Sequence, residues 1–437
     1  MKYRIFFLQV ICIILLCSCS NQKRVESIKV LNHQTIDLGD QFLGYGGFLT
    51  YCQGTIVGIE FNPALQPFFC LETDNSNFFF FGNKGRGPNE FLMPYSIQYI
   101  DNQTIGVFDI MSNTYSEFTP PGENEALNIE TATKLQTGQT RIIKTAFNQY
   151  INLSLSSNGE MFSLTDSTGM LIKTFFEPPY QNSTERKLQS RSFAYQGTLT
   201  TNSSKDKFVY TSFYGEIIHF YAIEDNSIEV IAKIENEYPL YKESDDEGGG
   251  VIYDAQGKSG YIAAYATENF VYAIYSGQTL LEQTEKRSVN FEGNILRIFN
   301  WDGSLVKEYE LDVLCSYLCV SDDDSTIWAI ASKPDQIALV SFELGAEVEK
   351  KQSEETRKMQ DVKVPDANPV KSERPIGTKY RYDVRTKDNQ QNEQTRKILD
   401  SIQNLPANVQ LDLGNRFDTR IETDTINNTK TIVLILK

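Results

Sequence analysis

The feature of this sequence that most restricts its fold is a long succession of short strand-like runs. From residue 26 to residue 345, apolar and polar residues alternate over short stretches separated by turn residues, and no long helical period interrupts them. The runs fall into groups of four, which span residues 43–82, 95–134, 139–176, 192–235, 259–311 and 315–343. The last group contains only three runs, and the segment 26–36 can supply the fourth.

This grouping predicts an all-β fold, a six-bladed β-propeller closed by an N-terminal strand. A four-stranded sheet has two faces to bury, and radial packing of such sheets covers both while it leaves only short edges exposed. The turn chemistry agrees, because Asp166-Ser-Thr-Gly169 and Trp301-Asp-Gly303 stand where hairpins must reverse. A pair of β-sandwiches would explain the strands but not the regular groups of four.

A Gly-rich connector follows the first group and reads Phe81-Gly-Asn-Lys-Gly-Arg-Gly-Pro-Asn-Glu-Phe-Leu-Met-Pro94. Its glycines permit positive φ, its first proline fixes the next φ, and its second phenylalanine can fill a gap before an extended segment. The residues of this motif are Gly82, Gly85, Gly87, Pro88, Glu90, Phe91 and Pro94.

The phrase Gly-Pro-x-Glu-Phe-x-x-Pro in this connector resembles the NHL type of propeller repeat, in which it links the outer strand of one blade to the inner strand of the next. It is closer still to the TolB-like six-bladed propeller lipoproteins of bacterial envelopes. The resemblance covers residues 25–345 in architecture, while only this motif is specific in sequence. It implies a propeller and does not name what the propeller binds.

The N-terminus has the pattern of a lipoprotein signal over residues 1–18. Lys2 and Arg4 precede the apolar run 5–16, which is too short to span a bilayer comfortably. Leu16-Cys17-Ser18-Cys19 resembles a bacterial lipobox, which implies acylation of Cys19 and a tether over 19–25. Ser20 favours the outer membrane and its periplasm-facing leaflet. The alternative is an ordinary signal peptide with a chance cysteine.

Charge and cysteine content limit the partners and the chemistry. The net charge of −16 disfavours binding to phosphate backbones, so we expect no nucleic-acid partner. The cysteines of the predicted propeller, Cys52, Cys70, Cys315 and Cys319, are expected to be buried and free, although the compartment would permit disulfides.

The C-terminal region breaks the strand pattern. Residues 346–375 are rich in charge and proline and are interpreted as a linker. Beyond them, residues 376–437 predict a small α/β appendage, with a helix around 398–405 and strands near 409–413 and 432–436.

No familiar catalytic pattern is found. The two histidines, His33 and His219, lie in strand-like runs, and the motifs of serine hydrolases, zinc proteases and P-loop proteins are missing. The acidic clusters 245–247 and 322–324 lack calcium-loop spacing and are interpreted as solvated turns. We therefore expect no catalytic residue, no metal site and no cofactor.

The long loops are the most informative candidates for binding. Segments 83–94, 177–191 and 236–258 connect blades, and 277–292 joins the second and third strands of the fifth group, so all four should project from one face. We call this the long-loop face. Its candidate binding residues are Arg86, Tyr180, Arg186, Tyr238, Tyr241, Tyr253 and Arg287.

These observations favour a membrane-tethered, non-enzymatic binding or scaffold protein with a protein or glycan partner. Some six-bladed propellers are metal-dependent lactonases, which is an alternative, but the innermost strands predicted here contain few acids. Glycan binding is a further alternative, and it predicts aromatic side chains clustered on the long-loop face.

Overall fold

The computed structural model describes residues 28–345 except 75, 137–138, 155–159, 180–187, 245–249, 286–291 and 334–335, and also describes 379–386, 417–424 and 429–436. The chain divides into two compact units, Met1–Glu355 and Thr356–Lys437. The predicted signal peptide, Cys19, the tether and the linker 346–375 lie outside the described residues.

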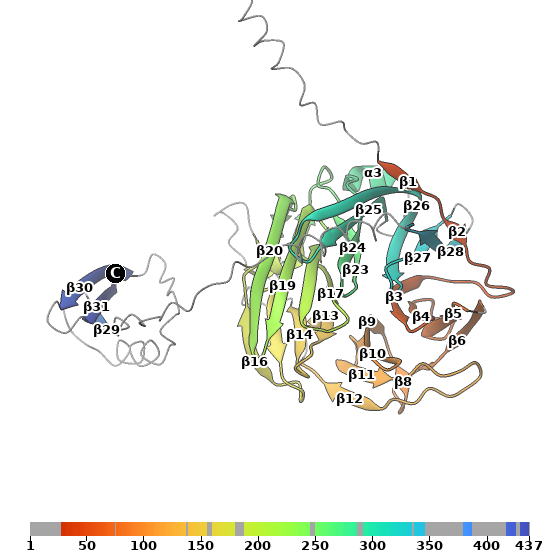
Figure 1. Cartoon of the computed structure of the whole chain (residues 1–437), viewed down its shortest axis with the longest axis horizontal. Helices are drawn as coiled ribbons and strands as arrows, with labels where there is room; N and C mark the ends of the chain where they lie inside the picture. Colours follow the sequence, from red (N-terminus) through yellow and green to blue (C-terminus); the bar gives the residue numbers. More distant parts are fainter. Residues whose placement is uncertain are drawn as a thin grey trace, which may run out of the picture. The chain divides into compact units, whose positions relative to one another are not determined.

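The first unit is a ring of antiparallel sheets, coloured from red to cyan in Figure 1. Four of these sheets have four strands each and follow one another along the chain. The first consists of β3 (Gly46–Cys52), β4 (Thr55–Glu60), β5 (Phe68–Glu72) and β6 (Asn77–Phe81), and the second of β9 (Pro94–Asp101), β10 (Thr104–Asp109), β11 (Thr114–Phe118) and β12 (Thr131–Lys134). The third consists of β13 (Gln139–Lys144), β14 (Tyr150–Ser154), β15 (Phe162–Thr165) and β16 (Leu171–Phe175), and the fourth of β17 (Gly197–Thr201), β18 (Lys207–Ser212), β19 (Glu216–Glu224) and β20 (Ser227–Glu237).

The last two groups of strands are fused into one sheet. It contains β23 (Tyr261–Ala266), β24 (Phe270–Tyr275), β25 (Gly293–Asn300), β26 (Leu305–Val320), β27 (Thr326–Ser332) and β28 (Ile337–Glu343). The sequence predicted separate strands at 304–311 and 315–320, which is wrong, because β26 runs through both. The segment between them contains neither glycine nor proline, and the pairing of β25 with β26 skips from Glu310 to Cys315 instead of ending.

The N-terminal segment lies along this fused sheet. Strand β1 (Lys29–Leu31) pairs in parallel with the first half of β26, and β2 (Gln34–Thr35) pairs antiparallel with β28. In this register Gln34 lies opposite Ser341, and the Ile36 amide donates to the Leu339 carbonyl at 2.9 Å.

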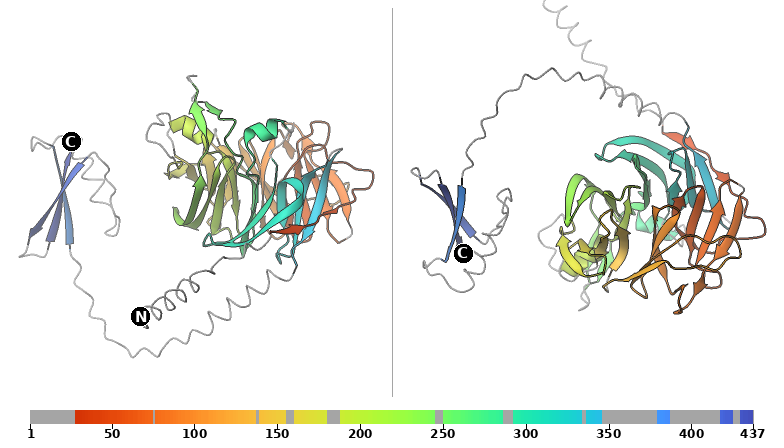
Figure 2. Two further views of the ribbon diagram at one scale, coloured as in Figure 1. Left: turned by 90° about the horizontal axis from the view of Figure 1, so that it is seen from above. Right: turned by 60° about the horizontal axis from the view of Figure 1, so that its bottom comes forward.

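Six strand segments form the inner wall of the ring, namely β3, β9, β13, β17, β23 and the second half of β26. Each contacts the next, and β26 contacts β3. We call them the inner strands. Apolar clusters fill the spaces between neighbouring sheets, as where Phe162 of β15 packs edge to face on Phe208 of β18 at 5.4 Å. The two views of Figure 2 show the same ring from other sides.

Two short helices interrupt the strands. The sequence predicted a strand over 192–202, but residues 188–194 form helix α2 (Leu188–Ala194), so the strand begins only at Gly197. Residues 190–192 and 194–195 are all nearly fully buried, so burial here does not alternate as it would along a half-exposed strand. Helix α3 (Leu280–Glu285) begins with a capping box in which Thr279 and Glu282 exchange hydrogen bonds.

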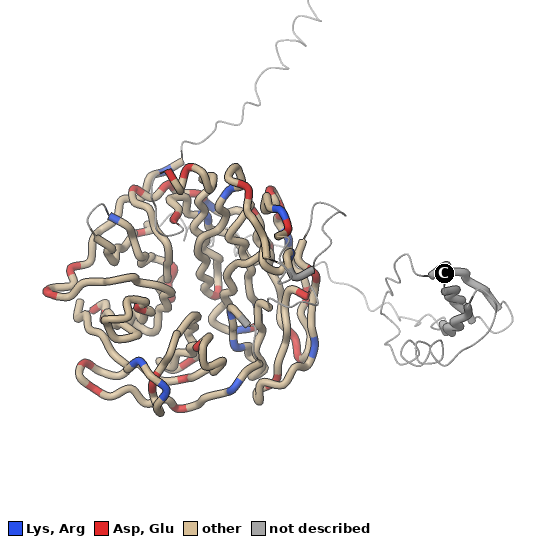
Figure 3. The backbone as a smooth tube through the Cα atoms, turned by 180° about the vertical axis from the view of Figure 1, so that it is seen from behind, with Lys and Arg blue, Asp and Glu red and all other residues tan. Residues whose placement is uncertain are grey.

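The propeller cysteines Cys52, Cys70, Cys315 and Cys319 are free and buried, as expected. Figure 3 shows acidic and basic positions interspersed around the ring. Among the residues the structure describes, no helix is both long and apolar enough to cross a membrane.

The second unit is described only by three strands, β29 (Lys379–Thr386), β30 (Phe417–Asp424) and β31 (Thr429–Leu436). Central β31 is parallel to β29 and antiparallel to β30. The expected strand 432–436 lies within β31, while the expected helix and the strand at 409–413 lie outside the described residues.

Candidate functional site: an aromatic cavity on the long-loop face

The Gly-rich connector joins the first two sheets through one buried aromatic side chain. Phe91 is 2% exposed and packs edge to face on Phe68 of β5 at 4.9 Å and on Phe118 of β11 at 5.8 Å. The turn that delivers it is closed by Glu90, whose carboxylate accepts from the Gly87 amide at 2.7 Å. The connector therefore sets the position of β9, which begins at Pro94.

The other described residues of the motif surround this turn. Gly82 has a φ of +80°, which a residue with a side chain adopts only under strain. The Gly85 amide donates to the Phe91 carbonyl at 3.0 Å, within the short parallel pair β7 (Asn83–Lys84) and β8 (Glu90–Phe91). Arg86 and Pro88 are exposed.

Three of the four long loops contact one another. The Ser190 hydroxyl of α2 donates to the Gly250 carbonyl at 3.3 Å, and the Tyr253 hydroxyl, on the hairpin of β21 (Tyr241–Glu243) and β22 (Val251–Tyr253), donates to the Phe193 carbonyl of α2 at 2.9 Å. The amides of Leu280 and Leu281 in α3 donate to the carbonyls of Gly257 and Ala255, each at 2.9 Å. The hairpin and α3 rise on the same side of the ring in the left view of Figure 2.

A cavity of about 470 Å³ lies where α2 and the hairpin meet the beginnings of the inner strands. Nine of its sixteen lining residues are aromatic, namely Tyr45, Phe48, Phe61, Tyr95, Phe193, Phe213, Tyr214, Tyr253 and Tyr317. We call it the aromatic cavity. Its size lies within the usual range of small-molecule sites, which are mostly apolar and contain a few placed polar groups.

The aromatic rings hold one another in place and remain partly open. Phe48 of β3 packs edge to face on Tyr317 at 4.9 Å and on Tyr95 at 5.8 Å, while Tyr214 stacks on Tyr253 at 3.8 Å. All five rings are half-buried. They therefore combine fixed positions with accessible surface.

Arg141 of β13 is the charged side chain on the described lining of this cavity. It is 6% exposed, and its guanidinium carbon lies 4.1 Å from the centre of the Tyr95 ring and 4.7 Å from that of Phe48. Nη1 donates to the Thr140 carbonyl at 3.1 Å, and buried Nε has no hydrogen-bond partner among the described residues. The site is positive and aromatic.

Arg141 also acts on its aromatic neighbours electrostatically. Burial raises the pKa of the Tyr317 hydroxyl, while the positive charge of Arg141 opposes that rise. No acidic side chain lies among the described residues that line the aromatic cavity. Arg141 therefore supplies the one charged side chain of this described lining, in a protein whose net charge is −16.

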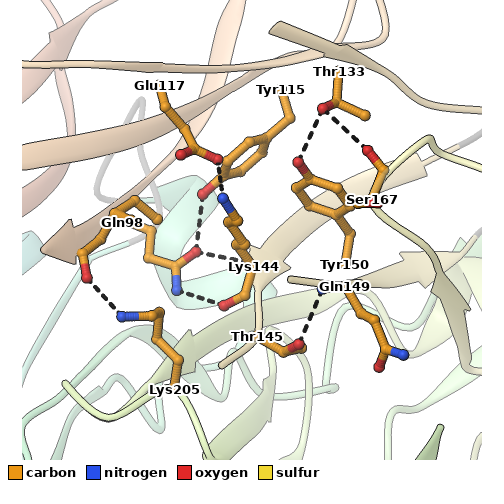
Figure 4. A network of polar contacts seen from close by, with 11 residues as sticks. Gln98, Tyr115, Glu117, Thr133, Lys144, Thr145, Gln149, Tyr150, Ser167 and Lys205 are labelled. Atoms are coloured by element: carbon orange, nitrogen blue, oxygen red, sulfur yellow. Dashed lines mark hydrogen bonds and ion pairs between the residues drawn. The ribbon is translucent and has the colours of Figure 1, made fainter. Parts of the chain in front are cut away.

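A polar clamp fixes the two strands that carry Tyr95 and Arg141 (Figure 4). The Gln98 side chain of β9 accepts from the Lys144 amide at 2.8 Å and donates to the Lys144 carbonyl at 3.0 Å. The Tyr115 hydroxyl donates to the same Gln98 oxygen at 3.0 Å, and Lys144 Nζ pairs with Glu117 at 2.5 Å. The clamp thereby holds β9 against β13.

A second cavity shares Phe48, Arg141 and Tyr317 with the aromatic cavity and is lined by residues of all six inner strands. Asp322 is the acidic residue of its lining, and burial, followed by the charges of Asp323 and Asp324, raises its pKa. Among the described residues, no group of three or more His, Cys, Asp or Glu side chains is placed to hold a metal ion.

The structure separates the predicted binding residues from one another. Tyr253 lines the aromatic cavity, whereas Arg86 lines a different groove, beside β11 and β12. Tyr238 and Tyr241 pack against the core between the third and fourth sheets, and the Tyr238 hydroxyl donates to Glu235 at 2.6 Å. Tyr180, Arg186 and Arg287 lie outside the described residues.

Sequence reasoning did not find Arg141, Phe48 or Tyr95 as site residues. The sequence contained one indication of Arg141. This residue is charged, whereas the other residues of its short inner strand are neutral up to the last position. A charge on the inner wall of a ring points toward the axis or must be paired there.

One acidic cluster also differs from expectation. The sequence predicted a solvated turn at 322–324, but Asp324 is 7% exposed, and its carboxylate accepts from Thr267, Asn269 and Tyr272 at 2.7 to 2.9 Å. Asp324 has a φ of +58°, which turns its side chain toward these donors from the neighbouring group of strands. It is a structural link. The cluster at 245–247 lies outside the described residues.

The two histidines have structural surroundings. His33 Nδ1 lies 2.8 Å from Asp312, and buried His219 lies between Tyr221 at 3.0 Å and Glu235 at 2.8 Å. Neither lines the aromatic cavity.

The ring of sheets around a common axis defines the first unit as a β-propeller. The sequence model of the TolB-like 6-blade propeller-like family matches residues 71–323, and the chain belongs to this family. No curated protein matches the chain.

Several solved structures are similar to this chain at low sequence identity. An exported protein from Bacteroides fragilis is 13% identical with a TM-score of 0.46, and the match covers 73% of this chain and 95% of that one. Regucalcin from Agrobacterium tumefaciens, a calcium-binding protein, is 8% identical with a TM-score of 0.42, covering 72% and 95%. Hydrazine synthase from Kuenenia stuttgartiensis is 10% identical with a TM-score of 0.38, covering 69% and 97%.

Proposed function

We propose that this chain is a non-enzymatic binding protein of the bacterial envelope, tethered to a membrane by acylated Cys19, whose aromatic cavity binds a glycan. The observation that carries the proposal is the set of nine aromatic residues around a cavity of about 470 Å³ on the long-loop face. A sugar ring has flat C–H faces that pack on aromatic rings and hydroxyls that bond at their edges. Half-buried tyrosines offer both kinds of contact.

We assign the remaining parts of the chain to holding the ring together and to positioning it at the membrane. The short pairing of β2 with β28 is proposed to close the ring, so that all six inner strands keep their spacing around the axis. The lipobox and Ser20 support a position on the outer membrane, facing the periplasm. Residues 376–437 are proposed to be a small α/β appendage beyond the linker 346–375.

A metal-dependent, lactonase-like enzyme is less well supported. Such a centre needs several oxygen or nitrogen ligands that converge on one point, and the described residues contain no group of three or more His, Cys, Asp or Glu side chains placed to hold a metal ion. A scaffold that docks a protein on the long-loop face remains the second candidate, supported by the exposed Arg86 of the connector.

Binding can be tested with the full-length protein purified in detergent and applied to an array of bacterial and plant oligosaccharides. We expect at least one class of glycan to bind, and Tyr45→Ala to reduce that binding, because Tyr45 lines the cavity and is 54% exposed. Phe42→Ala is the matched control, since Phe42 is 62% exposed and does not line it. If no glycan is retained, or if both variants bind equally well, the glycan proposal is wrong.

The tether can be tested by metabolic labelling with an alkyne fatty acid. The protein should carry the label and sediment with membranes, whereas Cys19→Ser should lose both properties. Cys17→Ser provides the control, because it changes the neighbouring cysteine of the same segment. Retention of label in Cys19→Ser would place the lipid elsewhere.

A further inference from the structure

We infer that the aromatic cavity selects a sugar that carries a carboxylate, a uronic acid, and that Arg141 is the residue that binds this carboxylate. The inference rests on the proposed function, since it names the class of glycan for the same cavity. It starts from a buried cation that has no anion beside it among the described residues.

A half-buried arginine elsewhere in this protein shows how a guanidinium stacked on an aromatic ring can be neutralised. Arg297 of β25 lies 4.2 Å from the centre of the Tyr275 ring, much as Arg141 lies over Tyr95. Yet Arg297 pairs with Glu308 at 2.7 Å and with Glu216 at 3.0 Å. Arg141 likewise lies over an aromatic ring, but no carboxylate in the described part of the chain pairs with it.

The missing partner matters because burial of a charge costs free energy unless the charge is paired. Contacts with the faces of Tyr95 and Phe48 offset part of this cost. They leave hydrogen-bonding capacity unused, because among the described residues Nε has no partner and Nη1 donates to the Thr140 carbonyl alone. A carboxylate, like a phosphate, presents two oxygens that match the planar fork of a guanidinium, and it is the anion that a uronic acid carries on its sugar ring.

The position of Arg141 suits a ligand rather than another part of the chain. Its guanidinium belongs to the lining of the aromatic cavity, and the described lining contains no acid that would repel an incoming carboxylate. The Gln98 clamp holds the Arg141 strand against the Tyr95 strand. A uronic acid could therefore place its ring on the aromatic wall while its carboxylate reaches Arg141.

The test is calorimetric titration of the full-length, detergent-purified protein at pH 7 with matched ligand pairs. Galacturonate is compared with galactose, glucuronate with glucose, and acetate supplies a carboxylate without a sugar ring. We expect each uronate to bind at least about tenfold more tightly than its neutral hexose, because a hydrogen bond to a charged group contributes enough binding free energy for about a tenfold change in affinity. Acetate should bind more weakly than either uronate.

Variants then assign the preference to one residue. Arg141→Gln should remove the difference between uronate and hexose, and Arg141→Lys, which keeps the charge but loses the fork, should retain part of it. Lys173→Gln is the control, because Lys173 is an exposed cation over an aromatic ring, Phe175, and does not line the cavity. Thermal melts of each variant report whether it is folded.

The outcomes separate this inference from the function on which it rests. Equal affinity of the wild-type protein for hexose and uronate would overturn the inference and leave glycan binding intact, and this comparison needs no variant. If acetate bound as tightly as the uronates, the sugar ring would contribute nothing to binding, and the inference that the cavity recognises a sugar would be overturned. Absence of binding by every sugar in this series would refute the inference, and the oligosaccharide array would then decide separately on glycan binding. A uronate preference that survives in folded Arg141→Gln would exclude Arg141 as its source.

Discussion

The Gln98 side chain is hydrogen-bonded to both backbone groups of Lys144, accepting from its amide at 2.8 Å and donating to its carbonyl at 3.0 Å. The side-chain amide of Gln98 thus pairs with a backbone N–H and a backbone C=O of the same residue, as the backbone of a neighbouring strand does in a continuous sheet. It therefore joins two inner strands that belong to different sheets, and these are the strands that carry Tyr95 and Arg141.

Replacing Gln98 should be costly for stability. In Gln98→Leu, the Lys144 amide and the buried Tyr115 hydroxyl lose their partner, and each unsatisfied group costs about 1–3 kcal/mol. We expect a loss of about 2–4 kcal/mol in the free energy of unfolding, measured by urea titration. Tyr115→Phe removes only one of these bonds and should cost about 1 kcal/mol. Equal stability of Gln98→Leu and wild type would show that the clamp contributes nothing.

The connector should depend on Phe91 more than on its exposed residues. Phe91→Ala removes a ring that is 2% exposed and lies between Phe68 and Phe118, so we expect about 3–5 kcal/mol of destabilisation. Phe147→Ala is the control, because Phe147 is 42% exposed and its truncation should cost little. Urea midpoints of the two variants that coincide would contradict the proposed joining of the first two sheets by Phe91.

His219 should make the protein less stable in mild acid. Burial lowers the pKa of His219 to about 4, although the nearby Glu235 carboxylate opposes this shift. Between the unfolded pKa, about 6.5, and the folded one, only the unfolded state binds a proton, so stability is complete above this window and falls as the pH drops through it. The loss should be on the order of 2–3 kcal/mol by pH 4.

The measurement is the free energy of unfolding from pH 7.5 to pH 4 for wild type and His219→Gln. The variant should lack this component, so the difference between the two proteins should shift against wild type as the pH falls. If wild type instead gains stability relative to the variant below pH 6.5, protonation would be favoured by Glu235 more strongly than it is opposed by burial.

The propeller cysteines should be chemically inert while the protein is folded. Burial raises the pKa of the Cys52 and Cys70 thiols to about 12 and raises those of Cys315 and Cys319 as well, and the thiolate is the form that reacts. Treatment with iodoacetamide at pH 8 should leave all four unmodified in native protein and modify them in urea, as read by mass spectrometry of peptides. Rapid labelling of any one in the native protein would contradict its burial.

Local pattern was enough to locate most strands of the propeller and the connector. Alternation of apolar and polar residues is a property of neighbouring positions, and burial of one face follows from it directly. The helix at 188–194 was missed because residues 177–191 were interpreted as a loop and residues 192–202 as one strand. The continuity of β26 was missed because a register shift does not show in one strand alone.

The sequence alone established a chain of short strands, a family-specific Gly-rich connector and the absence of familiar catalytic motifs. Only the tertiary structure decided that Arg141, Tyr95 and Phe48, which are far apart in the chain, meet at one cavity. The physical reason is that the pattern within one strand, even where a charge such as Arg141 stands out, does not show which residues of other strands lie beside it. Their proximity arises from the packing of separate sheets around an axis, which the local pattern of residues does not encode.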